Sequence, residues 1–176
     1  NGVVVGYEDG SFAPDSPLTR AEFTKIVVLG TAQDLPIATK TPFIDVPLGK
    51  WYTNYVAFCA DLGYVKGYSD GTFKPDQEIS KVEGLKILGE LVNWDVDSLD
   101  MNQASVAFKD VDLNAWYGPY LYYASEMNII DDIGEFFDPG KLITRGQMAE
   151  YIYRDYVVRE TGGAYEESKD SMFIIG

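Results

Sequence analysis

Histidine is absent from this chain of 176 residues, cysteine occurs once, and no apolar run is long enough to cross a bilayer. Without histidine, the commonest general base and metal ligand is missing. The sequence also contains no nucleophile elbow and no Cys–His pair, so we interpret the protein as non-enzymatic and expect no cofactor. Cys59 has no partner for an intrachain disulfide. Its place on the apolar face of a predicted helix favours an ordinary buried thiol over an intermolecular bridge or a reactive group.

Basic residues are also scarce, with 14 Lys and Arg against 28 Asp and Glu, which gives a net charge of −14. Nucleic-acid binding requires a basic face, and none is visible, so we expect no nucleic-acid partner. A hydrophobic content of 46% places the chain among globular proteins. The acidic surface suits an exposed extracellular protein, although acidic cytosolic proteins are common too.

One stretch occurs three times. The fullest copy is GYSDGTFKPDQEISKVEG at 67–84, an earlier copy is GYEDGSFAPDSPLTRAEF at 6–23, and a degraded copy is DDIGEFFDPGKLITRGQM at 131–148. Their prolines are Pro14, Pro75 and Pro139, which by subtraction lie 61 and 64 residues apart. This spacing indicates a tandem array of one small structural unit.

Each copy combines a Gly/Asp turn, an aromatic residue, a proline and then a capping box that opens a helix. The three boxes run from Thr19 to Glu22, from Ser80 to Glu83 and from Thr144 to Gln147. Inside each box a cation occupies the first helical position: Arg20, Lys81 and Arg145. A cation there faces the positive end of the helix dipole, which suggests an anion nearby, and mere surface charge stays open as the equal alternative. Because this position lies outside the capping bonds, we expect replacing Arg20 to leave stability almost unchanged.

Apolar residues at intervals of three and four predict four complete helices. They are expected at about 51–62, 81–93, 116–127 and 145–159, with Gly63 and Asn128 as left-handed residues that end the first and third of these. The division into units follows from the repeats: second half of motif 1 at 1–30, linker 31–42, motif 2 at 43–93, linker 94–107, motif 3 at 108–159, and a tail or connector at 160–176.

The start of the chain corresponds to the middle of a unit. NGVVVGY at 1–7 matches LGYVKGY at 62–68, so Gly2 is expected to end a helix that precedes this sequence. The second helix of motif 1 should then expose an apolar face with Phe23, Ile26 and Val27. We expect either self-association or a neighbouring segment to complete motif 1, with the apolar end of the chain at 172–175 as another candidate for covering that face.

Three elements in fixed order carry a resemblance to a known family. The F-x-D-V…W start at 43–51 and 108–116, the GY-x-DG loop and the T-R-A-E helix opening resemble S-layer homology (SLH) motifs over about residues 1–159. The resemblance implies an all-α fold in which tandem helix-loop-helix motifs form a pseudo-threefold helical bundle. It also implies an extracellular location at the cell surface or cell wall, and non-covalent binding of a wall polysaccharide or peptidoglycan in grooves between motifs.

Carried over position by position, the resemblance implies that nine residues bind polymer: Arg20, Gly6, Asp45, Trp51, Lys81, Gly67, Asp110, Trp116 and Arg145. The most complete groove is expected to combine the motif 1 loop and Arg20 with 45–51. Structural alternatives remain. Trp51 and Trp116 are expected to pack in the core, and Asp45 and Asp110 to fix the turn before each helix by Asx-type bonds. The sequence DVDLN at 110–114 resembles a calcium loop, but Ala115 and Leu121 replace required residues. No metal site is therefore expected.

Two classes of function remain open. In the first, the array anchors a surface protein, with the cations and helix N-termini holding anionic groups such as pyruvate ketals or phosphates. In the second, it is a structural subunit of a surface layer or extracellular fibre whose motifs mediate protein–protein assembly. Degraded repeats favour the second class and the retained cations favour the first.

Overall fold

The computed structural model describes residues 11–30, 34–131 and 134–167, and within these ranges the chain is helical with no strand. The helices are α1 (Arg20–Gly30), α2 (Thr53–Asp61), α3 (Lys81–Val92), α4 (Gly118–Glu126) and α5 (Arg145–Thr161). Their bounds agree with the expected helices to within two residues, the usual uncertainty of helix ends. The all-α prediction is confirmed.

Capping decides where the second helix of each motif begins. The Ser80 side chain accepts from the backbone N–H of Glu83 at 3.4 Å, and the Glu83 carboxylate accepts from the Ser80 N–H at 2.9 Å. The same reciprocal bonds open α1 at Thr19 and α5 at Thr144. The expected left-handed helix ends are also observed, with φ of 79° at Gly63 and 53° at Asn128. The local signals in the repeats are therefore confirmed.

A ring of three backbone hydrogen bonds joins the motifs just before these helices. The Ile79 N–H donates to the Leu18 carbonyl at 3.0 Å, the Leu18 N–H to Ile143 at 3.2 Å, and the Ile143 N–H to Ile79 at 3.0 Å. All three residues are fully buried. Because each motif donates to one neighbour and accepts from the other, the ring closes on itself, which is the basis of the pseudo-threefold arrangement.

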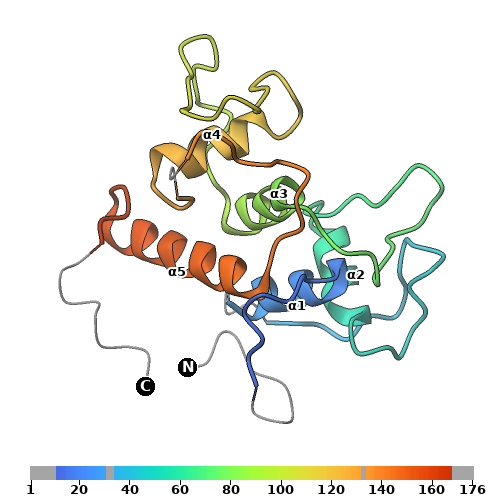
Figure 1. Cartoon of the computed structure of the whole chain (residues 1–176). Coiled ribbons are helices and arrows are strands. Elements are labelled where there is room, and N and C mark those ends of the chain that lie inside the picture. The colour runs from blue at the N-terminus through green and yellow to red at the C-terminus, as the bar shows by residue number, and fades with distance from the viewer. Residues whose placement is uncertain (1–10, 31–33, 132–133, 168–176) are drawn as a thin grey trace.

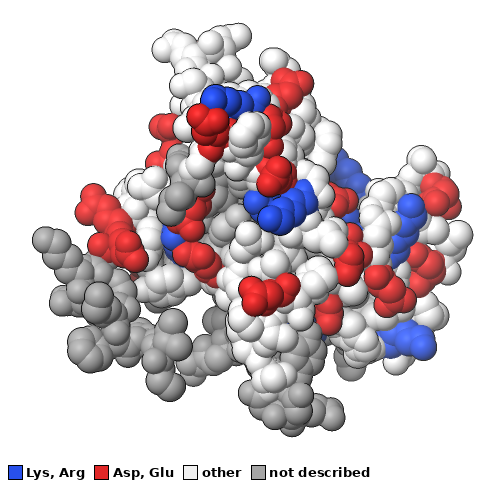
Figure 2. All heavy atoms as spheres, in the orientation of Figure 1, with Lys and Arg blue, Asp and Glu red and all other residues white. Residues whose placement is uncertain are grey.

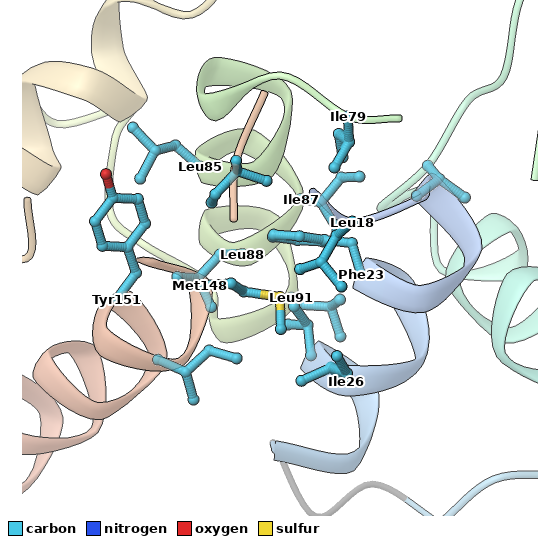
Figure 3. Close-up of a cluster of buried hydrophobic side chains, with 14 of the residues drawn as sticks. Leu18, Phe23, Ile26, Ile79, Leu85, Ile87, Leu88, Leu91, Met148 and Tyr151 are labelled. Carbon is cyan, nitrogen blue, oxygen red and sulfur yellow. The ribbon is translucent and has the colours of Figure 1, made fainter. Parts of the chain in front are cut away.

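The core lies around this ring. Helix α1 packs against α3 and α5, while α2 covers α1 and α4 covers α3 (Figure 1). Side chains from α1, α3 and α5 meet in the centre, among them Phe23, Leu88 and Met148 (Figure 3). Cys59 on α2 is fully buried, and burial raises the pKa of its thiol to about 12, as expected for an ordinary buried thiol.

The expectation of an open apolar face on motif 1 is wrong. Phe23 and Val27 are each 1% exposed and Ile26 is 8% exposed, because α2 of the next motif lies over α1. The second helices of motifs 1 and 2 are each covered by the first helix of the following motif, whereas α5 carries half-exposed aromatic residues at Tyr153 and Tyr156. The segment 172–175 lies outside the described residues.

Candidate functional site

Arg20 is held inside the fold by the neighbouring motif. Its side chain is 91% buried, and its Nε donates to the carbonyl of Phe73 in the motif 2 loop at 2.9 Å. The guanidinium lies over two rings of the same loop, 5.0 Å from the Tyr68 centroid and 4.8 Å from the Phe73 centroid. Nη1 forms an ion pair with Glu83 at 3.3 Å. Arg20 therefore makes structural contacts that the sequence did not indicate, and from these contacts we predict that replacing it lowers stability.

The other two cations repeat this contact around the ring. Lys81 Nζ donates to the Phe137 carbonyl at 2.6 Å, and Arg145 Nε donates to the Phe12 carbonyl at 2.9 Å. Each cation also lies over the ring of the aromatic residue whose carbonyl it binds, at 4.7 and 5.3 Å. Burial lowers the pKa of Lys81, and nearby Lys141 lowers it further. Each cation thus holds the loop of the next motif, a structural role that the sequence did not indicate.

The first two backbone amides of each of these helices bind loop carbonyls of the next motif. The Arg20 N–H donates to Gln77 at 2.8 Å and the Ala21 N–H to Pro75 at 3.0 Å. The amides at the starts of α3 and α5 bind the corresponding loops in the same way. The expectation that helix N-termini hold the anion is wrong for these amides, because the protein itself already satisfies them.

Asp45 and Asp110 hold the loops from the other side. The two carboxylate oxygens of Asp45 accept from the N–H groups of Phe73 at 2.8 Å and Lys74 at 2.7 Å. Asp110 binds Phe137 and Asp138 in the same manner, at 2.9 and 2.7 Å. Burial acts to raise the pKa of Asp110, but these backbone hydrogen bonds outweigh it, so the pKa is lowered. Both acids thus fix a loop far along the chain instead of the expected Asx-type turn next to them.

A cavity of about 220 Å³ opens beside Arg20, and we call it groove 1. All three motifs contribute to it: Arg20 from α1; Tyr64, Val65, Lys66, Gly67 and Tyr68 from the motif 2 loop; Glu83, Lys86 and Ile87 from α3; and Trp116 from motif 3. Within the described part of the chain, Nη2 of Arg20 has no hydrogen-bond partner, whereas Nε and Nη1 do. Groove 1 therefore offers a fixed, buried cation with free donors.

Gly67 gives groove 1 its loop geometry. Its φ of +64° is left-handed, and a Cβ added there would lie 2.4 Å from Phe43 Cε1 and 2.6 Å from the carbonyl oxygen of Thr72. Only glycine fits this position without displacing the loop. Three predicted site residues, Arg20, Gly67 and Trp116, thus meet in one cavity.

Trp51 and Trp116 are 53% and 55% exposed, so the expectation that they pack in the core is wrong. Each indole instead packs edge-on against the following tyrosine, Tyr52 or Tyr117. The expected pairing of Arg20 with 45–51 is also wrong, because Trp116 lines groove 1 and Trp51 lies beside Lys25, whose Nζ is 5.5 Å from the ring centroid. The exposed indole in groove 1 provides a flat apolar surface of the kind on which a sugar ring packs.

A second cavity, of about 260 Å³, lies at the equivalent place between motifs 2 and 3, and we call it groove 2. It is lined by Lys81, Phe108, Asp131, Phe136, Phe137, Gln147, Glu150 and Tyr151. Arg145 would belong to a third groove with the motif 1 loop, but Gly6 lies outside the described residues. The predicted site residues are therefore distributed over several places.

The prediction missed Lys66, Tyr68 and Lys86, all of which line groove 1. Figure 2 shows acidic side chains spread over one face, with Lys and Arg in smaller groups, so a concentration of cations in one cavity stands out. The signal was present in the repeat register, which pairs Lys66 with Asp131 and Lys86 with Glu150.

No helix in the described ranges has the length and apolarity that a bilayer crossing requires. The same residues contain no cluster of three or more Cys, Asp or Glu side chains arranged to bind a metal ion.

The family model of the S-layer homology domain matches residues 1–24, 42–83 and 107–149. Over 147 residues the chain is 33% identical to "Cell surface glycoprotein 1" of Acetivibrio thermocellus, covering 77% of this chain and 6% of that protein. It is 34% identical over 116 residues to the "Cellulosome-anchoring protein" of the same organism, covering 63% of this chain and 25% of that protein.

A third relative is the "S-layer protein sap" of Bacillus anthracis, which is 28% identical over 133 residues, covering 76% of this chain and 16% of that protein. The chain thus spans a quarter or less of the length of these three relatives. The three matched segments coincide with the three repeated units that build the ring and the grooves. The chain belongs to the S-layer homology domain family.

Proposed function

We propose that this chain is a non-catalytic, extracellular anchoring module that binds an anionic cell-wall polysaccharide or peptidoglycan in groove 1. The observation that carries the proposal is the guanidinium of Arg20, which belongs to the cavity lining, is held by Phe73, Glu83 and Tyr68, and has no partner for Nη2 among the described residues. A preorganised guanidinium binds a carboxylate or phosphate without paying the entropy of ordering a flexible side chain.

The surroundings of Arg20 support a polymer ligand. Lys66 and Lys86 add positive charge at the same cavity, and the exposed face of Trp116 lies at its edge. An anionic group on a sugar would place its charge on the cations and its ring against the indole. The names of relatives such as the "Cellulosome-anchoring protein" are consistent with anchoring. Of the predicted site residues, Asp45, Asp110, Lys81 and Arg145 are proposed to support the loops that shape the grooves.

A pull-down with purified cell wall at several salt concentrations tests the proposal. We expect binding that weakens as salt rises, because the contacts are charged. Trp116→Ala should weaken binding about tenfold, or roughly 1.4 kcal/mol. Ile37→Ala is the control, because Ile37 is an apolar side chain that is 84% exposed and lines neither groove 1 nor groove 2. Equal retention of both variants and the wild type on wall fragments would refute groove 1 as the anchoring site.

A second candidate function is assembly into a surface layer or fibre, and a specific observation favours it. Ile44, Leu48 and Trp51 in motif 2 are 80%, 55% and 53% exposed, and apolar side chains of this kind are typical of protein contacts. Sedimentation without wall material distinguishes the two functions. Concentration-dependent assembly that Ile44→Ser abolishes would support the second candidate, whereas a stable monomer that binds wall fragments would support anchoring.

A further inference from the structure

Grooves 1 and 2 are built on the same plan but carry opposite charges. In the repeat register Lys66 corresponds to Asp131, and Lys86 to Glu150. Groove 1 is therefore lined by three cations and one carboxylate, whereas groove 2 is lined by one cation and two carboxylates. The loop-holding cation is retained in both, so the difference lies in the residues around it.

The ion pair on the second helix is reversed as well. In α3, Lys86 Nζ pairs with Glu90 at 2.9 Å, and the Tyr120 hydroxyl donates to the same carboxylate oxygen at 2.6 Å. In α5 the same two positions are Glu150 and Arg154, which pair at 2.5 Å. The acid in α3 thus lies one helical turn beyond the cavity lining, and in α5 the acid lies in the lining itself.

Groove 2 also has an internal partner for its carboxylates. Nη2 of Arg154 binds Asp131 at 2.6 Å as well as Glu150, and its Nη1 donates to the Asn128 carbonyl at 3.1 Å. The Arg154 side chain is only 13% exposed and lies against the ring of Tyr165. In groove 1 Lys86 is paired with Glu90, but no side chain among the described residues bridges Lys66, which is exposed and forms neither a hydrogen bond nor an ion pair.

We infer that Lys66 and Lys86 are the specificity-determining residues that make groove 1 a site for an anionic sugar substituent. Their counterparts Asp131 and Glu150, bridged by Arg154, exclude such a group from groove 2. An anion entering groove 2 meets two carboxylates and a Lys81 already bound to the Phe137 carbonyl. Of these two grooves, the chain therefore binds through one. This inference rests on the proposed function, because it names the residues that select the ligand.

The experiment follows NMR signals from each groove during titration with two probes, a methyl hexoside carrying a pyruvate ketal and a methyl hexoside phosphate. The indole N–H of Trp116 reports on groove 1, and the side-chain amide of Gln147 reports on groove 2. The indole of Trp94, buried and bound to Asp155 at 2.6 Å, reports on the folded core. The two probes separate a carboxylate from a phosphate as the favoured substituent.

We expect saturable shifts of the Trp116 signal and none of Gln147 in the wild type. Lys66→Asp with Lys86→Glu, which copies groove 2, should weaken binding at Trp116 at least about tenfold. The milder Lys66→Gln with Lys86→Gln should also weaken it and leaves less risk of misfolding. The control Lys40→Asp with Lys109→Glu changes the net charge equally outside both grooves and should bind as the wild type does.

The reverse exchange completes the test. Asp131→Lys with Glu150→Lys should create a second binding event at Gln147, with Trp94 unchanged as evidence of folding. A wild-type response at Gln147 as strong as that at Trp116 would overturn the inference, and so would unchanged binding by the folded Lys66→Gln/Lys86→Gln variant. Absence of any response at Trp116, combined with retention on cell wall, would overturn the groove assignment and leave anchoring standing. A response at Trp116 without retention on cell wall would support the groove assignment and overturn anchoring.

Discussion

Replacing Arg20 with alanine should destabilise the fold as well as remove a cation from groove 1. The Arg20 side chain is 91% buried, donates from Nε to the Phe73 carbonyl and lies over the rings of Tyr68 and Phe73. Removing the side chain leaves that carbonyl without its side-chain partner and removes both cation–π contacts. The loss therefore falls on the contact between motif 1 and the motif 2 loop.

The magnitude follows from these contacts. A hydrogen bond from a charged donor contributes about 1.5–3 kcal/mol, and each cation–π contact contributes roughly 0.5–2 kcal/mol. These terms share one side chain and are not additive, so we expect a loss near 3 kcal/mol. For a chain of this size that loss lowers Tm by about 6–12 °C. Arg20→Lys, which keeps the charge but not the planar fork, should fall between alanine and the wild type.

Urea and thermal unfolding, followed by tryptophan fluorescence and near-UV circular dichroism, measure the loss. Lys109→Ala is the matched control, because Lys109 forms an ion pair with Glu135 while 61% exposed and should change stability by less than about 0.5 kcal/mol. An Arg20→Ala variant as stable as this control would refute the structural role. If the variant is destabilised as expected, its wall binding must be measured well below its own Tm, since unfolding alone would otherwise abolish retention.

Other perturbations address the caps, the loop and pH. Each of the N-cap variants Thr19→Ala, Ser80→Ala and Thr144→Ala should lower the free energy of unfolding by about 0.5–2 kcal/mol in thermal melts. No loss in any of the three would contradict the observed helix starts. Gly67→Ala should destabilise by at least about 2 kcal/mol because its Cβ meets backbone and ring atoms, whereas Gly71→Ala, with φ +80° and open space, should lose about 1 kcal/mol. Equal melts for the two glycine variants would refute the close approach. Because the pKa of Asp110 is lowered in the folded protein, the stability that its ionised carboxylate provides is fully present above the unfolded pKa of about 3.9. This stability is lost as the pH falls through the folded pKa. Urea melts between pH 5 and 2.5 should therefore show that acid lowers the free energy of unfolding less for Asp110→Asn than for the wild type. The same dependence on pH in both proteins would contradict this.

The sequence predicted what depends on neighbours along the chain. The capping boxes at Thr19, Ser80 and Thr144 specify helix starts within four residues, and the left-handed Gly63 and Asn128 specify helix ends, so these features were confirmed. The motif boundaries, such as 43–93 and 108–159, stay predictions.

What depends on how repeats meet was not predicted. The sequence places Arg20 in a groove with 45–51, but the ring turns each motif toward the next one, so Arg20 lies over Tyr68 and shares a cavity with Trp116. Burial of Phe23 by α2 was missed for the same reason. Helix periodicity shows which face is apolar and cannot show which repeat covers it. The charge exchange between Lys66 and Asp131 was readable from the repeat alignment, but it has meaning only once both residues are placed at a cavity.

The ring of Leu18, Ile79 and Ile143 also fixes how this architecture can grow. In an open repeat array each unit contacts only its neighbours, so units can be added or lost at either end. Here the backbone N–H of each of the three residues donates to one of the other two, and its carbonyl accepts from the third. All three amides and all three carbonyls are therefore paired within the ring, and none is left to pair with a fourth unit. Inserting one more motif would break an existing bond before it made a new one. Duplication can therefore raise the number of grooves only by adding whole closed rings in tandem.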